Sequence, residues 1–253
     1  MTQPLYDLPA CLPSGVVEDQ DNINRFTGFI NAFAHAGLNL PGGALYFADG
    51  VMAFFRQTGF LGNQDFTAAV DKHALSVTER TTIWRAHTSV WAAKSCAGLD
   101  GDFVEFGTHL GTTPLVINDC LPGIFSARTL WLYDLFEADE QYFGDLPEDA
   151  FAFVQRRLAG INARIIKGAL PDSFLDSGPE RIAFAHLDVT HAQIERELLA
   201  AFLDRVVPGG IILFGNYGHC LAPYRDIQSA IDSVLGQYAV LELPTGQGLF
   251  VKR

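Results

Sequence analysis

Basic residues and cysteines are scarce in this sequence, and long apolar runs are absent. Its 253 residues include 17 Lys and Arg against 29 Asp and Glu, which gives a formal charge of −12. No run of Lys or Arg forms a basic patch, so neither nucleic acid nor an anionic membrane is expected as a partner. No stretch reaches the roughly 18 apolar residues that a membrane-spanning helix needs.

The four cysteines, Cys11, Cys96, Cys120 and Cys220, lie far apart and form no CxxC pair. This spacing gives no support to a zinc site, and a chain this large and rich in core residues does not need a disulfide framework. The N-terminal segment has neither a basic start nor a long apolar run, so no signal peptide is expected. We therefore predict a cytoplasmic protein with reduced thiols.

Hydrophobic residues make up 49% of the chain, enough for a sizeable core, and the residue pattern changes near Leu99. Before Leu99, apolar and aromatic residues recur at helical spacing, so we expect residues 1–98 to form a helical cap or lid. This region either only packs on the main domain or also lines an acceptor pocket, and it is a possible homo-oligomer surface. The expected helices span 22–37, 49–60 and about 76–97, and Ser76 and Glu79 form a capping box at the start of the last one.

After Leu99 the pattern alternates between strands and helices, which is typical of a parallel sheet covered by helices on both faces. Two further strands close the chain across a short Gly-containing turn, so they can only pair antiparallel. Residues 99–253 are thus predicted as one α/β domain with a doubly wound, mostly parallel seven-stranded sheet and a terminal antiparallel hairpin. The expected strands span 102–107, 129–136, 162–167, 181–188, 211–214, 238–243 and 249–252, and the expected helices span 111–121, 148–159, 191–205 and 224–235.

Ligands of open α/β sheets bind beyond the carboxyl ends of the strands, so residues at the predicted strand ends are candidates for a site. The first strand runs into a turn where Gly107 and Gly111 would let backbone N–H groups approach a ligand, although a plain strand-to-helix turn explains the same glycines. Glu105 stands inside this apolar strand, where a carboxylate is costly unless it has a partner. It could accept a hydrogen bond from an amino group of a ligand.

The ends of the next strands add polar and small residues to the same edge of the predicted sheet. Asp134 ends the second strand, where it could accept both hydroxyls of a ribose or merely cap the next turn. Leu135 and Phe136 follow it and could flank a purine base. Gly168 offers a backbone edge after the third strand, and Asp188 ends the fourth strand.

Five segments between about Gly101 and Gly218 resemble those of class I S-adenosylmethionine-dependent methyltransferases, and in particular the macrocin O-methyltransferase family: GDFVEFGTHLG, WLYDLFE, IIKGALPDSF, IAFAHLDVT and VVPGGIILFGNYG. That family methylates sugar hydroxyls of natural products, using S-adenosylmethionine and a divalent metal. The resemblance implies the same cofactor and a small-molecule acceptor for this chain. The residues expected at the cofactor are Glu105, Phe106, Gly107, Thr108, His109, Gly111, Thr112, Asp134, Leu135, Phe136, Gly168, Ala169 and Asp188.

The sequence departs from this family at the metal ligands. By resemblance, Asp188 is the first metal-binding and catalytic carboxylate. The next Asp of the family is replaced by Val189, and two adjacent Asp residues after the fifth strand are replaced by Gly215 and Asn216. One carboxylate and one amide are a poor set for Mg²⁺, which is usually bound through charged oxygen ligands. We therefore expect no metal site.

Without a metal, the proton of an acceptor hydroxyl must be removed by a general base, or the acceptor must be a better nucleophile. We expect Asp188, His191 and His219 to be the catalytic residues, because both histidines follow strand ends and histidine titrates near neutral pH. His109 also lies near the predicted site, whereas His186 is expected to point into the sheet. The acceptor group stays open between a natural-product hydroxyl, a phenol and an amine.

Two other functions are compatible with the sequence. A relative that binds S-adenosylmethionine without transferring its methyl group would account for the missing metal carboxylates. A nicotinamide-dependent oxidoreductase is less favoured, because the G-x-G-x-x-G fingerprint is absent and Glu105 stands inside the first strand.

Overall fold

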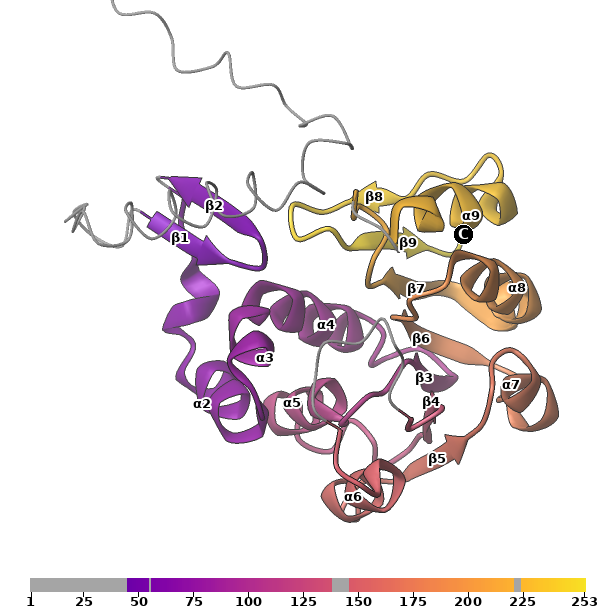
Figure 1. The fold of residues 1–253 in the computed structure, drawn as a ribbon, viewed down its shortest axis with the longest axis horizontal. Coiled ribbons are helices and arrows are strands. Elements are labelled where there is room, and N and C mark those ends of the chain that lie inside the picture. Colours follow the sequence, from indigo (N-terminus) through magenta and orange to yellow (C-terminus); the bar gives the residue numbers. More distant parts are fainter. Residues whose placement is uncertain (1–44, 55, 138–145, 221–223) are drawn as a thin grey trace, which may run out of the picture.

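The computed structural model describes residues 45–54, 56–137, 146–220 and 224–253, and Figure 1 shows their arrangement. The helix predicted at 22–37 lies outside the described residues, as does Cys11. Cys96, Cys120 and Cys220 are free thiols. In the part of the chain that the structure describes, no helix combines the length and the apolar character that crossing a membrane requires.

One seven-stranded sheet forms the centre of the molecule, in the order β5-β4-β3-β6-β7-β9-β8. Strands β3 to β7 are parallel, and β9 pairs antiparallel with both β7 and β8, which confirms the predicted sheet and its terminal hairpin. The strands are β3 (Asp102–Phe106), β4 (Leu130–Asp134), β5 (Ala163–Lys167), β6 (Ile182–Leu187), β7 (Val206–Phe214), β8 (Leu241–Glu242) and β9 (Gly248–Val251).

Helices cover both faces of this sheet, so each strand sends alternate side chains into two separate cores. Phe103 packs in the core beneath one helix layer, while the next residue, Val104, packs in the core beneath the other. The first layer consists of α4 (Ile83–Ser95), α5 (Thr112–Cys120) and α6 (Ala150–Arg157), and the second of α7 (Asp172–Ser177), α8 (Ala192–Phe202) and α9 (Ile227–Leu235), with 3₁₀ turns η2 (Leu203–Arg205) and η3 (Tyr224–Asp226) at two of their ends.

The described part of the N-terminal region contains a β-hairpin, so the prediction of a helix at 49–60 is wrong. Asp49 and Gly50 have φ values of +56° and +67°, and such a pair forms the tight turn that joins antiparallel strands. The residues after the turn therefore pair back along the chain instead of winding into a helix. The elements are β1 (Leu45–Ala48), β2 (Val51–Phe54) and the 3₁₀ turn η1 (Gly59–Gly62).

Helix α2 (Gln64–His73) was not predicted from the sequence, and the single helix expected at about 76–97 is two helices, α3 (Val77–Thr81) and α4. Ser76 accepts a hydrogen bond from the Glu79 backbone N–H at 3.1 Å, which confirms the predicted cap of α3. The break falls at Thr82, and α4 gains its own cap from the hairpin. The Asp49 carboxylate accepts from the backbone N–H groups of Trp84 at 2.9 Å and of Arg85 at 3.0 Å.

Candidate active site

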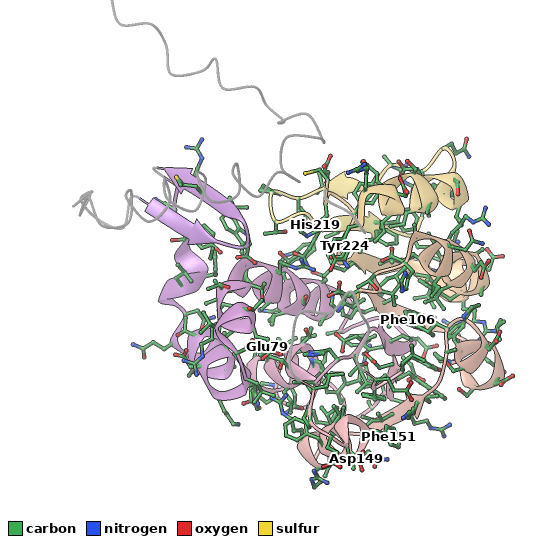
Figure 2. The ribbon with its side chains drawn as sticks, in the orientation of Figure 1. Glu79, Phe106, Asp149, Phe151, His219 and Tyr224 are labelled. Atoms are coloured by element: carbon green, nitrogen blue, oxygen red, sulfur yellow. The ribbon has the colours of Figure 1, made fainter. Side chains whose placement is uncertain are left out.

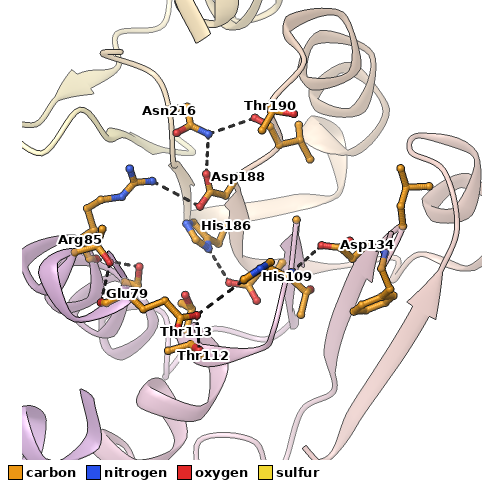
Figure 3. A pocket seen from close by; sticks show the side chains of 18 of the residues that line it. Glu79, Arg85, His109, Thr112, Thr113, Asp134, His186, Asp188, Thr190 and Asn216 are labelled. Carbon is orange, nitrogen blue, oxygen red and sulfur yellow. Dashed lines mark hydrogen bonds and ion pairs between the residues drawn. The ribbon is translucent and has the colours of Figure 1, made fainter. Parts of the chain in front are cut away.

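A cavity lies at the carboxyl ends of β3, β4 and β6, where the strand order reverses and where doubly wound sheets bind their ligands. Its volume is about 460 Å³, within the size range of small-molecule pockets. Helices α3 and α4 contribute side chains to its wall, so the N-terminal region and the sheet form the cavity together (Figure 3).

The turn after β3 is held by hydrogen bonds within the protein. The backbone N–H groups of Gly107 and Thr108 donate to the Tyr133 carbonyl at 2.9 and 3.3 Å. Gly107 has φ +84°, and a Cβ atom added there would lie 2.2 Å from the Asp188 carbonyl oxygen. Gly111 begins α5 with φ +74°. The two glycines thus let the ends of β3 and β6 approach each other and let α5 begin at once.

Asp134 connects the ends of the first two parallel strands. One carboxylate oxygen accepts from the His109 backbone N–H and the other from the Phe136 backbone N–H, each at 2.7 Å. Asp134 lines the cavity together with half-exposed Leu135 and buried Phe136. A carboxylate offers about four acceptor positions, so both oxygens keep acceptor capacity toward a ligand.

Glu105 and His186 form a buried pair at the floor of the cavity. The Glu105 Oε1 and His186 Nδ1 atoms lie 2.8 Å apart, because the two residues are register partners on parallel β3 and β6. Within the described residues, Glu105 Oε2 has no hydrogen-bond partner. Burial raises the pKa of Glu105, whereas the hydrogen bond and charge of Glu105 raise the pKa of His186 against the opposing effect of burial. The floor of the cavity therefore carries an acidic oxygen that lacks a protein donor.

Asp188, at the end of β6, faces an amide and a guanidinium. Its Oδ1 atom accepts from Asn216 Nδ2 at 2.7 Å, and its Oδ2 atom lies 3.6 Å from Arg85 Nη2. Arg85 Nη2 also donates to the Gly215 carbonyl at 2.9 Å. Figure 3 shows these side chains converging at one end of the cavity. A cation supplied by α4 therefore stands beside the carboxylate at this end.

His219 contacts the guanidinium of Arg85. Its Nε2 atom is 3.4 Å from Arg85 Nη1, and since arginine only donates, this nitrogen is the acceptor. Burial and the neighbouring Arg85 charge lower the pKa of His219. The ring is therefore neutral near pH 7, and its basic nitrogen already faces a donor.

The structure brings most of the predicted site residues to one cavity. Phe106, Gly111, Ala169 and His219 do not line it. The Phe106 ring packs in the core beneath the second helix layer, where it stacks on Tyr133 and Phe202. Figure 2 labels Phe106 within the sheet. The predicted residues that line the cavity are Glu105, Gly107, Thr108, His109, Thr112, Asp134, Leu135, Phe136, Gly168, Asp188 and His191.

Three charged residues that line the cavity, Glu79, Arg85 and Glu137, were not predicted as site residues. Glu79 lies on α3, and its Oε1 atom accepts from the Thr112 hydroxyl at 2.9 Å, which ties α3 to the start of α5. Arg85 lies on α4. Glu79 is visible in the sequence only as part of a capping box, and nothing in the local pattern around Arg85 indicates that its helix would face the sheet edge.

The donor set at Asp188 does not fit a divalent cation. Within the described ranges, no three His, Cys, Asp or Glu side chains come together in a metal-binding arrangement. Asp188 has a neutral amide, Asn216, as its neighbour where a second carboxylate would be needed, and the Arg85 guanidinium places a fixed positive charge against it.

No protein-family model matches the sequence, and no curated protein sequence does so either. Among solved structures, the fold is similar to that of the calicheamicin methyltransferase CalS11, with a TM-score of 0.57 and 14% identity, covering 97% of this chain and 98% of that chain. It is also similar to the O-methyltransferase NovP, with a TM-score of 0.56 and 17% identity, covering 67% of this chain and 80% of that chain.

A third similar structure is that of the O-methyltransferase TomG from Streptomyces achromogenes in complex with S-adenosylmethionine. Its TM-score is 0.50 and its identity 14%, and the match covers 76% of this chain and 91% of that chain. Identities this low establish an architecture and leave the resemblance to the macrocin O-methyltransferase family a prediction. The chain has the fold of class I methyltransferases.

Proposed function

We propose that this protein transfers the methyl group of S-adenosylmethionine to a small-molecule acceptor. The observation that carries the proposal is that two acidic groups, Glu105 and Asp134, line one cavity at the switch point of this fold. The unpartnered Glu105 Oε2 atom suits a positively charged ligand group, and Asp134 suits two neighbouring hydroxyls. S-adenosylmethionine has both, an amino group beside a sulfonium and a ribose.

Each part of the cavity then has a role in holding the cofactor. Glu105 faces the positively charged end, and Asp134 accepts from the ribose. Leu135, Phe136 and Gly168 line the same wall and flank the adenine. Bound in this way, S-adenosylmethionine supplies a methyl carbon that is already activated for displacement, so the protein chiefly aligns the acceptor with it.

The acceptor lies at the Asp188 end of the cavity, where Asp188 or His191 receives its proton. We propose a metal-independent reaction, because the residues around Asp188 do not fit a divalent cation. The described part of residues 1–98 acts as the acceptor-side wall through Glu79 and Arg85. The sequence resemblance to the macrocin O-methyltransferase family, together with similar structures of methyltransferases from calicheamicin biosynthesis and tomaymycin synthesis, supports a natural-product acceptor.

Cofactor binding is tested by titrating S-adenosylhomocysteine into the protein in a calorimeter. We expect micromolar affinity for the wild type and no heat from NADH. Asp134→Ala is expected to weaken binding roughly 100-fold, since it removes charge-assisted hydrogen bonds to two hydroxyls. Glu105→Gln, which keeps the shape of the side chain, is expected to weaken it less.

The matched control is Asp176→Ala, which removes an exposed carboxylate on α7 and is expected to leave the affinity unchanged. Thermal melting curves establish that each variant is folded. Unchanged affinity in both Asp134→Ala and Glu105→Gln would show that the site has been placed wrongly. Binding of S-adenosylhomocysteine without any methyl transfer would instead favour a non-methylating relative.

Metal independence predicts that EDTA leaves the rate of methyl transfer unchanged. The charge arrangement around Asp188 is the reason, because the Arg85 guanidinium already stands against this carboxylate. A second measurement needs no acceptor. Mg²⁺ titrated into the complex with S-adenosylhomocysteine is expected to give no heat of binding. Loss of activity in EDTA that is restored by Mg²⁺ contradicts this part of the proposal.

A further inference from the structure

Building on the proposed function, we propose that Arg85 binds the acceptor atom itself, and that this atom is the oxygen of a phenol or an enol. The cationic side chain of Arg85 stands beside Asp188 on the wall of the same cavity.

Arg85 has donors left for a ligand. Its side chain lines the cavity and is 18% exposed. Among the described residues its contacts are the Gly215 carbonyl, Asp188 Oδ2 and His219 Nε2, which engage three of the five N–H groups of a guanidinium. The remaining donors are the Nε–H group and one hydrogen on Nη1.

The charge at this end of the cavity favours a ligand that becomes negative. Asp188 is the single carboxylate in contact with the guanidinium among the described residues, and its other neighbour, Asn216, is neutral. His219 adds no negative charge, because an imidazole is neutral or positive. When Asp188 takes up a proton, the Arg85 guanidinium loses its one carboxylate contact among the described residues, and an acceptor oxyanion replaces it.

The free N–H donors of Arg85 favour an oxygen over a nitrogen as the acceptor atom that receives the methyl group. A neutral amine has one lone pair, so a hydrogen bond from Arg85 would occupy the electrons that must attack the methyl carbon. A phenolate oxygen has three lone pairs and stays nucleophilic while it accepts. A protonated amine is repelled by the guanidinium outright. An amine acceptor is therefore excluded by the same group that stabilises an oxyanion.

The acidity of the acceptor is limited by the groups available to remove its proton. A phenol resembles the tyrosine side chain, whose pKa is about 10, and one carboxylate with one guanidinium is suited to ionise it. A sugar alcohol is far less acidic, and without a metal the site offers it no comparable help. Apolar side chains beside the charged pair, Ala86, Val189 and Ile194, line the cavity and suit a flat ring.

The chemical step follows from these contacts. The O–H proton of the acceptor passes to the Asp188 carboxylate while Arg85 donates to the oxygen. The oxygen forms a bond to the methyl carbon, the carbon–sulfur bond breaks, and its electron pair stays on sulfur. The products are a methyl ether and a neutral thioether, and the proton leaves Asp188 to solvent.

The experiment measures transfer of labelled methyl groups to three probes, 4-methoxyphenol, 4-methoxyaniline and methyl glucoside. We expect the phenol to be methylated and the other two not. Arg85→Gln is expected to lower kcat/KM for 4-methoxyphenol roughly 100-fold, the scale of removing an oxyanion donor. The loss of kcat/KM in Arg85→Gln is expected to be smaller with 4-nitrophenol, because this phenol ionises without help from the protein. Arg85→Lys keeps the charge, loses the planar fork and falls in between.

The matched control is Arg80→Gln, which removes an exposed charge from α3 and is expected to leave the rates unchanged. Calorimetry with S-adenosylhomocysteine is run on every variant, and Arg85→Gln is expected to bind it as the wild type does. Failure of the wild type to bind it defeats the proposed function. If the wild type binds S-adenosylhomocysteine, three results overturn only the role of Arg85. These are methylation of the aniline or the glucoside, absence of phenol methylation, and an equal loss of kcat/KM in Arg85→Gln with both phenols.

Discussion

Replacing Gly107 by alanine is expected to destabilise the protein by about 4 kcal/mol or more, a loss reserved for changes that the structure cannot absorb. The added Cβ atom would lie 2.2 Å from the Asp188 carbonyl oxygen and 2.9 Å from its carbonyl carbon. Both contacts are with backbone, so no side chain can rotate away. To fit the methyl group, the ends of β3 and β6 would have to separate at the cavity. Urea unfolding of the wild type and the variant measures the loss.

Gly123→Ala is the matched control for backbone strain. Gly123 has φ +83°, almost the angle of Gly107, but an added Cβ atom would meet nothing closer than Ser126 Oγ at 3.4 Å. Its expected cost is therefore only the strain of the left-handed conformation, about 1–2 kcal/mol. The difference between the two variants isolates the contact with Asp188. Equal losses would mean that the strand ends at the cavity are not packed as the structure has them.

Replacing His186 by leucine is expected to cost about 3–5 kcal/mol near neutral pH, because it leaves the Glu105 carboxylate buried without its partner. Removing both partners avoids this penalty. The double variant with Glu105→Leu and His186→Leu is thus expected to recover most of the lost stability, since buried pairs replaced by apolar residues are often neutral for folding. A double variant less stable than His186→Leu alone would contradict this account of the pair.

The same pair gives the stability a pH dependence with a defined sign. The folded-state pKa values of Glu105 and His186 both lie above their ordinary values of 4.5 and 6.5. The native state therefore holds more protons than the unfolded chain. The stability contributed by each group is fully present below its ordinary pKa and is lost as the pH rises through its raised one.

The stability of the wild type is therefore expected to fall as the pH rises above the ordinary values of 4.5 for Glu105 and 6.5 for His186, and the double variant is expected to lack that fall. In His186→Leu, acid neutralises the stranded Glu105, so the stability deficit of this variant is expected to shrink as the pH is lowered. Urea unfolding at a series of pH values measures both effects. A deficit that grows on acidification would contradict the assigned direction.

The sheet and the cofactor side of the cavity were predictable because local signals agree there. Strand and helix patterns alternate after Leu99, and the strand ends at Gly107, Asp134 and Asp188 meet at one edge by the geometry of parallel sheets. The Glu105–His186 pair was also within reach. Glu105 stands two positions before Gly107, and His186 stands two positions before Asp188. Because Gly107 and Asp188 directly follow their strands, aligning the two strand ends places Glu105 and His186 side by side.

The acceptor side was not predictable, because it depends on how separate segments dock. Arg85 lies on α4, and its place beside Asp188 follows from packing between α4 and the sheet. The hairpin at Asp49 and Gly50 was missed for a different reason. Its turn signal was present, but apolar residues after it at near-helical spacing favoured a helix, and pairing between β1 and β2 decided the outcome.

The carboxylate of Asp49 has a consequence that extends past the hairpin. It caps the first turn of α4 from a turn 35 and 36 residues earlier in the chain, and one of the two N–H groups that it accepts from belongs to Arg85. Asp49 itself does not line the cavity. Natural variation in an outlying turn could therefore retune which compounds are modified, while every residue that touches them stays the same. Comparing pocket residues alone would then misjudge how far two such proteins have diverged.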